Sequence, residues 1–283
     1  MALAVPRLSE LTRSVSIPAS VAIYWHLLSL DAPTVAALWC WSFGKAAHLE
    51  LPPLAPLLLA VGTWLIYVAD RILDGLDSTK KTQLRQRHYF YLRHRAVFLV
   101  MGYIITPVFA WVVFTRMSPT VRMEDAGVFV IAALYFLLVH AHGQWAERWL
   151  PKELAVGILF AAATAVPTWA RAENARAELL PLVVIFAVLC WLNCVAIESW
   201  EGAALWAGRH LQMLTASAAV LAGTLAVFSL NNSSRFCLLL ASTLSALLLL
   251  WMARHRTSLT TLQLRVAADA ALLTPLLFAA WMR

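Results

Sequence analysis

Long stretches without a charged residue recur along the whole chain, and they constrain its fold more than any other feature. A helix needs about 20 apolar residues to cross the hydrocarbon core of a membrane. Only helices and closed barrels satisfy every backbone polar group in lipid. The stretches therefore predict membrane-spanning helices. They are Leu51–Ala69, Val97–Thr115, Ala126–Ala146, Leu154–Ala170, Leu179–Ile197, Leu211–Ser234 and Phe236–Ala253.

Single acidic residues interrupt the apolar segments at the two ends of the chain. The last segment, Val266–Met282, contains only Asp269, and near the start Asp31 separates Val15–Leu30 from Ala32–Gly44. The two early segments together fit one span, with room for an interfacial helix before it. We therefore expect an all-α, polytopic transmembrane helical bundle of about nine transmembrane helices, with eight or ten as alternatives. Residues 1–283 form a single transmembrane domain in this interpretation.

The balance of residue types supports a membrane environment. Apolar residues make up 61% of the chain and charged residues 13%, whereas a soluble domain carries about 25% charged residues. The shortfall is too large for a surface that faces water. The formal net charge of +7 is explained by membrane topology, so we expect membrane lipid around the chain and no nucleic-acid partner.

The distribution of basic residues predicts the orientation of the helices. With nine spans, 15 of the 22 Lys and Arg residues fall on the side that holds the N-terminus. Cytoplasmic loops carry an excess of Lys and Arg. We therefore expect a multi-pass protein of a bacterial inner membrane, with a cytoplasmic N-terminus and a large basic cytoplasmic loop after the second span.

Three aspartates follow the second predicted span. Asp70, Asp74 and Asp77 are spaced i, i+4, i+7, so on a helix they project within about 60° of one another. Carboxylates this close repel one another unless a cation holds them. Mg²⁺ takes oxygen ligands and commonly bridges carboxylates to a substrate phosphate. The spacing is equally that of a charged helix end paired with Arg71 or Lys81.

The sixth predicted span ends in a similar way. Glu198 and Glu201 repeat the spacing of Asp74 and Asp77, and Asn193 takes the place of Ala69. If the two helices are neighbours, the two acidic segments face one another at the same side of the membrane. Surface charge is again the alternative. Asp269 lies one turn from Arg265, which favours a structural ion pair between them.

Basic residues surround the two acidic segments in the sequence. Arg and Lys side chains bind phosphate oxygens, and the combination of acids, cations and apolar helices fits a lipid diphosphate. Basic runs beside a span also serve as topology determinants or as anchors for anionic lipid. The candidate diphosphate-binding residues are Arg71, Arg85, Arg87, His88, Arg93, Arg148 and Lys152.

The chain resembles the UbiA superfamily of membrane-embedded prenyltransferases. The likeness rests on Tyr67-Val-Ala-Asp70-Arg-Ile-Leu-Asp74-Gly-Leu-Asp77, on 193–201, and on Pro151-Lys-Glu-Leu-Ala-Val-Gly157 at the start of the fifth span. The family's first motif reads Asn-Asp-x-x-Asp-x-x-x-Asp. This chain departs from it with Ala69 before Asp70 and with its Asp spacing, and its second motif contains Glu, which indicates a divergent branch.

The resemblance implies transfer of a prenyl group from an isoprenyl diphosphate to a lipophilic acceptor, such as an aromatic or quinone-type compound. It implies Mg²⁺ as the cofactor, which would stabilise the departing diphosphate. The implied metal ligands are Asp70, Asp74, Asp77, Glu198 and Glu201, and Asn193 joins them as a candidate catalytic residue.

Two other functions remain open from the sequence. A membrane-bound terpene cyclase on the same scaffold would release the same diphosphate without an acceptor. A non-catalytic protein that binds lipid or a partner would require no Mg²⁺. The oligomeric state is also open.

Overall fold

The computed structural model describes residues 17–76, 86–142, 151–201 and 207–282. Within these ranges every regular element is a helix, which confirms the all-α fold class. The helices are α2 (Ile17–Leu27), α3 (Asp31–Ala46), α4 (Leu54–Leu76), α5 (Gln86–Arg93), α6 (Arg95–Arg116), α7 (Pro119–His142), α9 (Lys152–Trp169), α10 (Arg176–Trp200), α11 (Ala207–Phe228), α12 (Ser233–Arg254), α13 (Thr261–Ala271) and α14 (Pro275–Phe278), with a short 3₁₀ helix, η2 (Arg256–Ser258), before α13.

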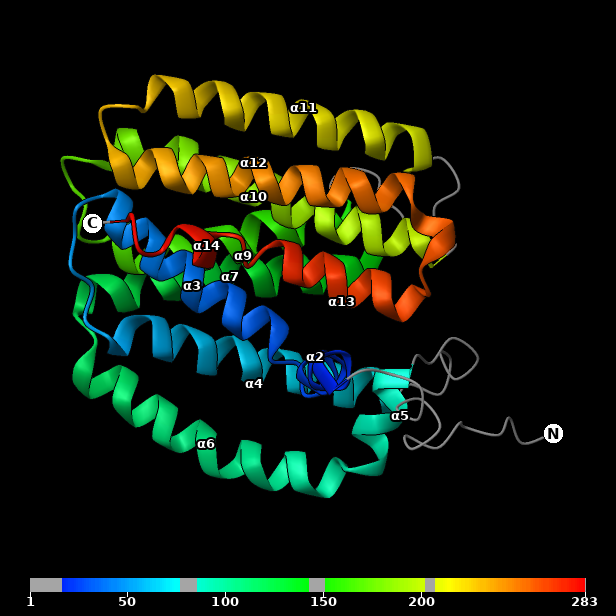
Figure 1. Ribbon diagram of the computed structural model, residues 1–283. Helices are drawn as coiled ribbons and strands as arrows, with labels where there is room; N and C mark the ends of the chain where they lie inside the picture. The colour runs from blue at the N-terminus through cyan, green and yellow to red at the C-terminus, as the bar shows by residue number, and fades with distance from the viewer. Residues whose placement is uncertain (1–16, 77–85, 143–150, 202–206, 283) are drawn as a thin grey trace.

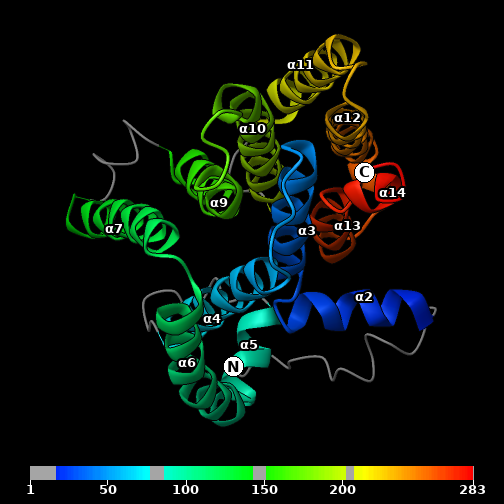
Figure 2. The same cartoon turned by 90° about the vertical axis from the view of Figure 1, so that its left-hand side faces the viewer.

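The long helices lie side by side, and α3 occupies the centre of the bundle (Figures 1 and 2). It contacts α4, α9, α10, α12, α13 and α14. Helices α6, α7 and α11 lie farther out. One end of the bundle, here called the α5 end, is where α4, α10 and α12 finish and α13 begins (right in Figure 1).

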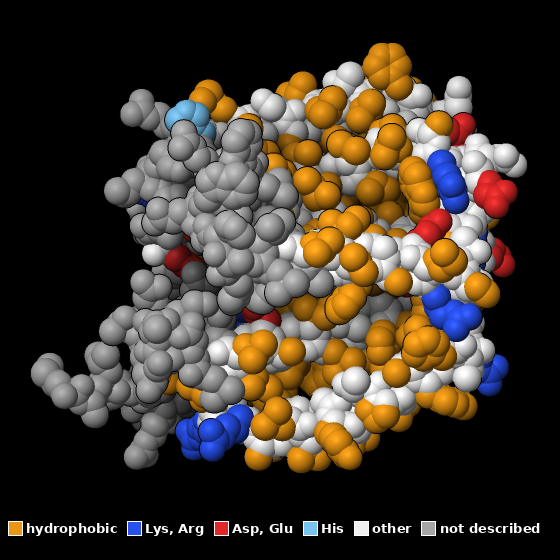
Figure 3. All heavy atoms as spheres, turned by 180° about the vertical axis from the view of Figure 1, so that it is seen from behind, with side chains coloured by type: hydrophobic (Ala, Val, Ile, Leu, Met, Phe, Trp, Pro, Cys, Tyr) orange, Lys and Arg blue, Asp and Glu red, His pale blue; other side chains and the backbone are white. Residues whose placement is uncertain are grey.

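The chain is a multi-pass membrane protein. Six helical segments of the described part are long and apolar enough to cross a membrane, or seven if α2 and α3 form one bent span. Helices α7 and α9 coincide with the fourth and fifth predicted spans, and the count of nine stays a prediction. On α6, large apolar side chains such as Tyr103 and Phe114 are exposed, and apolar side chains cover much of the face in Figure 3. This surface suits lipid rather than water.

Helices α2 and α3 meet at an angle of 91°, so α2 crosses the bundle (end-on in Figure 1, lengthwise in Figure 2). Ser29 makes the turn possible with a φ of 53°. The 16 residues of α3 reach only about 24 Å, less than the ~30 Å hydrocarbon core. In Figure 1 the α2–α3 bend accordingly lies inside the level at which α10 and α12 end.

Aromatic and small residues pack α3, α9 and α10 together. The rings of Trp39 and Phe186 stack with their centroids 4.1 Å apart. At Gly157, helices α9 and α10 approach so closely that an added Cβ would lie 2.8 Å from the backbone nitrogen of Trp191. Small residues permit such approach in membranes, where helix association depends on close packing.

The break between α13 and α14 is closed by side chains from other helices. Trp39 Nε1 donates to the carbonyl of Leu272 at 2.8 Å, and Ser245 Oγ donates to the carbonyl of Ala271 at 2.7 Å. Thr274 Oγ1 donates to the carbonyl of Ala241 at 2.8 Å. The first two bonds give the carbonyls of Ala271 and Leu272 hydrogen-bond donors that the interrupted helix and the lipid cannot provide, and the third ties the break to α12.

Candidate functional site

A small cavity of about 50 Å³ lies where α3, α4, α9, α10 and α13 meet. Its walls are mainly apolar, but Tyr67 from α4 and Asn193 from α10 bring polar groups to it, as does Asp269 from α13. Helices α4 and α10 are the two that carry the acidic segments. The lining residues are Ala32, Val35, Tyr67, Val156, Phe160, Cys190, Asn193, Cys194, Asp269 and Leu272.

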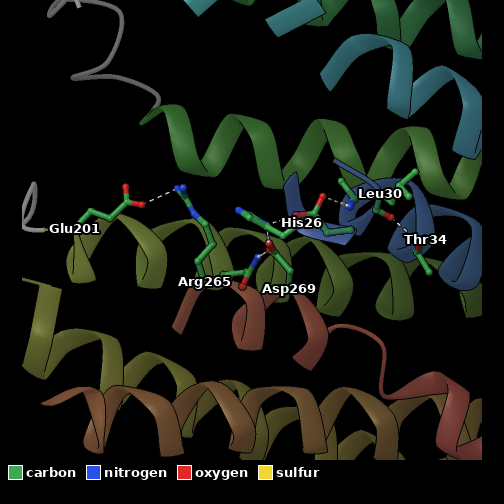
Figure 4. A network of polar contacts seen from close by, with 9 residues as sticks. His26, Leu30, Thr34, Glu201, Arg265 and Asp269 are labelled. Atoms are coloured by element: carbon green, nitrogen blue, oxygen red, sulfur yellow. Dashed lines mark hydrogen bonds and ion pairs between the residues drawn. The ribbon is translucent and has the colours of Figure 1, made fainter. Parts of the chain in front are cut away.

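A cluster of four polar side chains borders this cavity, here called the His26 cluster: His26, Asp31, Asn193 and Asp269. Nδ1 of His26 lies 2.7 Å from Oδ2 of Asp31 and 3.5 Å from Oδ2 of Asp269. Asn193 Nδ2 donates to Oδ1 of Asp269 at 3.0 Å. Figure 4 shows His26 and Asp269 pointing toward one another.

Local structure brings these residues together from distant parts of the chain. His26 stands in the last turn of α2, and Asp31 is the first residue of α3, so the bend places them face to face. An acidic residue at a helix N-terminus is stabilised by the helix dipole, and Oδ1 of Asp31 accepts from the backbone N–H of Ala32 at 2.9 Å. The cluster therefore links α2 and α3 to α10 and α13.

Glu201 and Arg265 form an ion pair closer to the α5 end than the His26 cluster (Figure 4). Arg265 Nη2 lies 2.8 Å from Oε1 of Glu201, and their side chains are 9% and 14% exposed. The predicted pairing of Arg265 with Asp269 is wrong. Asp269, one turn along α13, contacts His26 and Asn193 instead, because α10 presents Glu201 to Arg265.

The acidic segment of α4 is partly described. Asp70 is exposed, and its Oδ2 accepts from Arg71 Nη1 at 2.6 Å. Arg71 is buried, with its guanidinium 5.5 Å from the ring centroid of Tyr67. The side chain of Asp74 and all of Asp77 lie outside the described residues. In the described part of this segment, Arg71 therefore lies over Tyr67, which lines the small cavity.

The remaining predicted site residues are placed as follows. Glu198 is partly exposed on the last turns of α10, while Lys152, at the start of α9, is exposed. Both lie close enough to Cys194 to act on it electrostatically. Arg93, at the end of α5, is exposed. Outside the described residues are Arg85 and Arg148, and the side chains of Arg87 and His88.

A shared metal ion was predicted between the two acidic segments. In the described part of the chain, one group of metal-binding side chains is compact enough to share an ion. It consists of His26, Asp31 and Asp269. Asp70 is paired with Arg71, and Glu201 with Arg265. Because Asp74 and Asp77 fall outside that part, the Mg²⁺ site stays a prediction.

A larger apolar groove, here called the lateral groove, runs between the α2–α3 connection and α4, α5 and α6. Its volume of about 490 Å³ lies within the usual range for small-molecule sites. Apolar and aromatic side chains line it except at His94. They include Leu30, Trp64, Phe90, Phe98 and Ile105.

The sequence interpretation missed His26 and Asp31 as site residues and assigned Asp269 another role. The available signal was that Asp31 and Asp269 interrupt otherwise apolar segments, since ionisable residues at membrane depth are functional more often than not. His26, which carries no formal charge, gave no such signal. Comparisons of this chain with protein-family models, with curated protein sequences and with solved structures found no match.

Proposed function

We propose that this protein is a membrane-embedded prenyltransferase that moves a prenyl group from an isoprenyl diphosphate to a lipophilic acceptor. The observation that carries the proposal is the position of α4 and α10. Both helices line the same cavity, through Tyr67 and through Asn193 with Cys194. Both then continue toward the α5 end (Figure 1), and the acidic segment of each begins within two turns of these residues.

The lateral groove supports a lipophilic substrate. It borders α4 on the side of α5 and α6, and its apolar lining suits a prenyl chain, whose burial is favourable by about 25 cal/mol per Å². His94 stands among the lining residues and Arg93 is its exposed neighbour. A diphosphate at the α5 end would therefore meet the Arg93 guanidinium and the His94 imidazole while its chain lies in the groove.

The residues at the α5 end fit a Mg²⁺–diphosphate by the chemistry of their donors. Asp70, Asp74, Asp77, Glu198 and Glu201 offer only oxygen, which Mg²⁺ prefers. When bound, Mg²⁺ would stabilise charge on the leaving diphosphate. Arg71 and Arg265 now neutralise Asp70 and Glu201, and on loading they could turn to phosphate oxygens. The further candidates to bind the diphosphate are Arg85, Arg87, His88, Arg93, Arg148 and Lys152.

We further propose that the α5 end faces the cytoplasm of a bacterial cell. Most of the chain's Lys and Arg residues belong to loops on this side when nine spans are counted. A diphosphate substrate made in the cytoplasm would then reach the acidic segments without crossing the membrane.

The proposal is tested by diphosphate release from a series of isoprenyl diphosphates, using purified full-length protein with and without Mg²⁺. We expect Mg²⁺-dependent release with an aromatic or quinone-type acceptor. The variant Asp74→Ala should lose that turnover while eluting as the folded protein. The matched control Asp125→Asn, near the start of α7 and at the opposite end of the bundle, should retain it.

Other outcomes would change the assignment. Release of diphosphate together with a cyclised hydrocarbon, in the absence of any acceptor, would identify a terpene cyclase. No release from any prenyl diphosphate by folded protein would remove the enzyme and favour a protein that binds lipid or a partner. Full activity of Asp74→Ala would remove the metal-site assignment.

A further inference from the structure

The His26 cluster places three potential metal-ligand atoms together in the membrane interior. Nδ1 of His26 and a carboxylate oxygen from each of Asp31 and Asp269 all lie within 4.8 Å of one another. They come from three helices, α2, α3 and α13, so the arrangement is produced by the tertiary fold. None of the three is an acidic residue of α4 or α10, and the inference does not rest on the proposed prenyl transfer, although the two share the small cavity and Asn193.

Each carboxylate is oriented by a hydrogen bond to its other oxygen. Oδ1 of Asp31 accepts from the backbone N–H of Ala32 at 2.9 Å, and Oδ1 of Asp269 accepts from Asn193 Nδ2 at 3.0 Å. Both Oδ2 atoms are left directed at His26, at 2.7 and 3.5 Å. Such outer contacts are what fix metal ligands in place in proteins.

The charge of the cluster fits a divalent cation. His26 is 5% exposed, and the side chains of Asp31 and Asp269 are 14% and 21% exposed. Two ionised carboxylates leave a charge of −2 beside a neutral imidazole and −1 beside a protonated one, and without a metal the sum reaches zero only when the imidazole and one carboxyl are both protonated. Unbalanced charge is costly away from water. A divalent cation bound by two carboxylates and a neutral imidazole brings the sum to zero.

Asn193 gives an independent indication of a ligand. Asn193 is 6% exposed, and its Oδ1 has no hydrogen-bond partner. A buried acceptor without a partner costs about 1–3 kcal/mol, so such atoms call for an explanation. Asn193 and Asp269 both line the small cavity. Its volume of about 50 Å³ is enough for a metal-bound water, since one water needs about 10–15 Å³.

We propose that His26, Asp31 and Asp269 bind one divalent transition-metal ion, with Zn²⁺ as the first candidate, and that Asn193 Oδ1 or a water completes the site. An imidazole ligand favours Zn²⁺ and its neighbours over Mg²⁺, which prefers oxygen alone. One nitrogen and three oxygens provide the four ligands that Zn²⁺ commonly takes in proteins. The ion would join the crossing helix α2 to α3 and to the last span.

The test uses purified full-length protein that has been stripped with a chelator and dialysed against Zn²⁺, with the bound metal counted by elemental analysis. We expect one Zn²⁺ per chain and a rise in melting temperature on binding, because a ligand of the folded state stabilises it. His26→Gln and Asp269→Asn should each weaken binding at least 100-fold. Asn193→Ala should weaken it about 10-fold, as loss of an orienting residue does.

The matched control is His48→Gln. His48 lies just beyond the far end of α3, where its imidazole contacts Asn232 at 2.8 Å, and its loss should leave Zn²⁺ binding unchanged. If the cluster variants fail to fold, Co²⁺ absorption of the wild-type protein decides instead. A nitrogen- and oxygen-ligated Co²⁺ spectrum that Zn²⁺ displaces at one equivalent supports the site. Absence of bound metal in wild type, or equal binding by folded His26→Gln, would overturn it.

Discussion

At the residue scale, two ion pairs with buried arginines are the main feature of the α5 end, and of their acidic partners Glu201 is mostly buried while Asp70 is exposed. Arg265 pairs with Glu201, and Arg71 with Asp70 while its guanidinium lies over Tyr67. A buried pair adds little to stability compared with apolar residues, but removing one partner leaves a charge without compensation. The two arginines therefore compensate the charge of their acidic neighbours.

The Glu201–Arg265 pair can be tested by a double-mutant cycle. We expect Arg265→Met to destabilise the protein by about 3–5 kcal/mol, because it leaves Glu201 without its cation in a site that is 14% exposed. The double variant Glu201→Gln with Arg265→Met should lose less than the sum of the single changes. Denaturant unfolding in detergent measures this, and strictly additive losses would show that the pair is not coupled.

At the scale of elements, the helix break between α13 and α14 leaves a carbonyl that needs a hydrogen-bond donor, and Trp39 is placed to provide it. Its indole N–H is the partner of the Leu272 carbonyl, so Trp39→Phe should leave that carbonyl unpaired and cost about 1–3 kcal/mol of stability. The control is Trp251→Phe on α12, where the side chain is 52% exposed. Thermal melting should show a loss for Trp39→Phe alone, and equal melting of both variants would contradict the role given to this bond.

Two glycines give a matched test of how closely α9 and α10 pack. An Ala at Gly157 would bring its Cβ to 2.8 Å from the Trp191 nitrogen, whereas at Gly102 on α6 nothing lies within 4 Å. Gly157→Ala should therefore cost about 1–3 kcal/mol by overpacking. Gly102→Ala should be neutral or stabilise by up to about 1 kcal/mol through helix propensity. Equal unfolding midpoints for the two variants would exclude close packing at Gly157.

The sequence predicted the long helices well because each needs only a local property, an apolar stretch of sufficient length. It could not predict the 91° bend between α2 and α3, since no Pro or Gly marks it and Ser29 adopts the left-handed turn. The same limit applies to the site. Asn193 was singled out from its position in a motif, but its partner Asp269 lies 76 residues away and is brought near by packing.

At the scale of the whole molecule, the arrangement has a polar interior that is displaced toward one end. The His26 cluster borders the small cavity, and the Glu201–Arg265 pair lies nearer the α5 end (Figure 4). At the opposite end, Arg235 pairs with Glu178 and contacts the carbonyl of Ala46, which ties α12 to α10 and α3. This asymmetry is what the proposed function requires, since that proposal places the diphosphate at the α5 end.

The orientation of that asymmetry is open to a direct measurement. Ser118, between α6 and α7, and Ser258, in η2, are both exposed, and they mark the two ends of the bundle. We expect Ser258→Cys to react with a membrane-impermeant maleimide only in inside-out vesicles, and Ser118→Cys only in right-side-out vesicles, because loops rich in Lys and Arg favour the cytoplasmic side. The unsubstituted chain supplies the background, to which the partly exposed Cys194 can contribute, whereas Cys40, Cys190 and Cys237 are buried. The reverse pattern would place the acidic segments outside the cell, away from a cytoplasmic diphosphate, and labelling of both variants from one side would require an even number of spans between them.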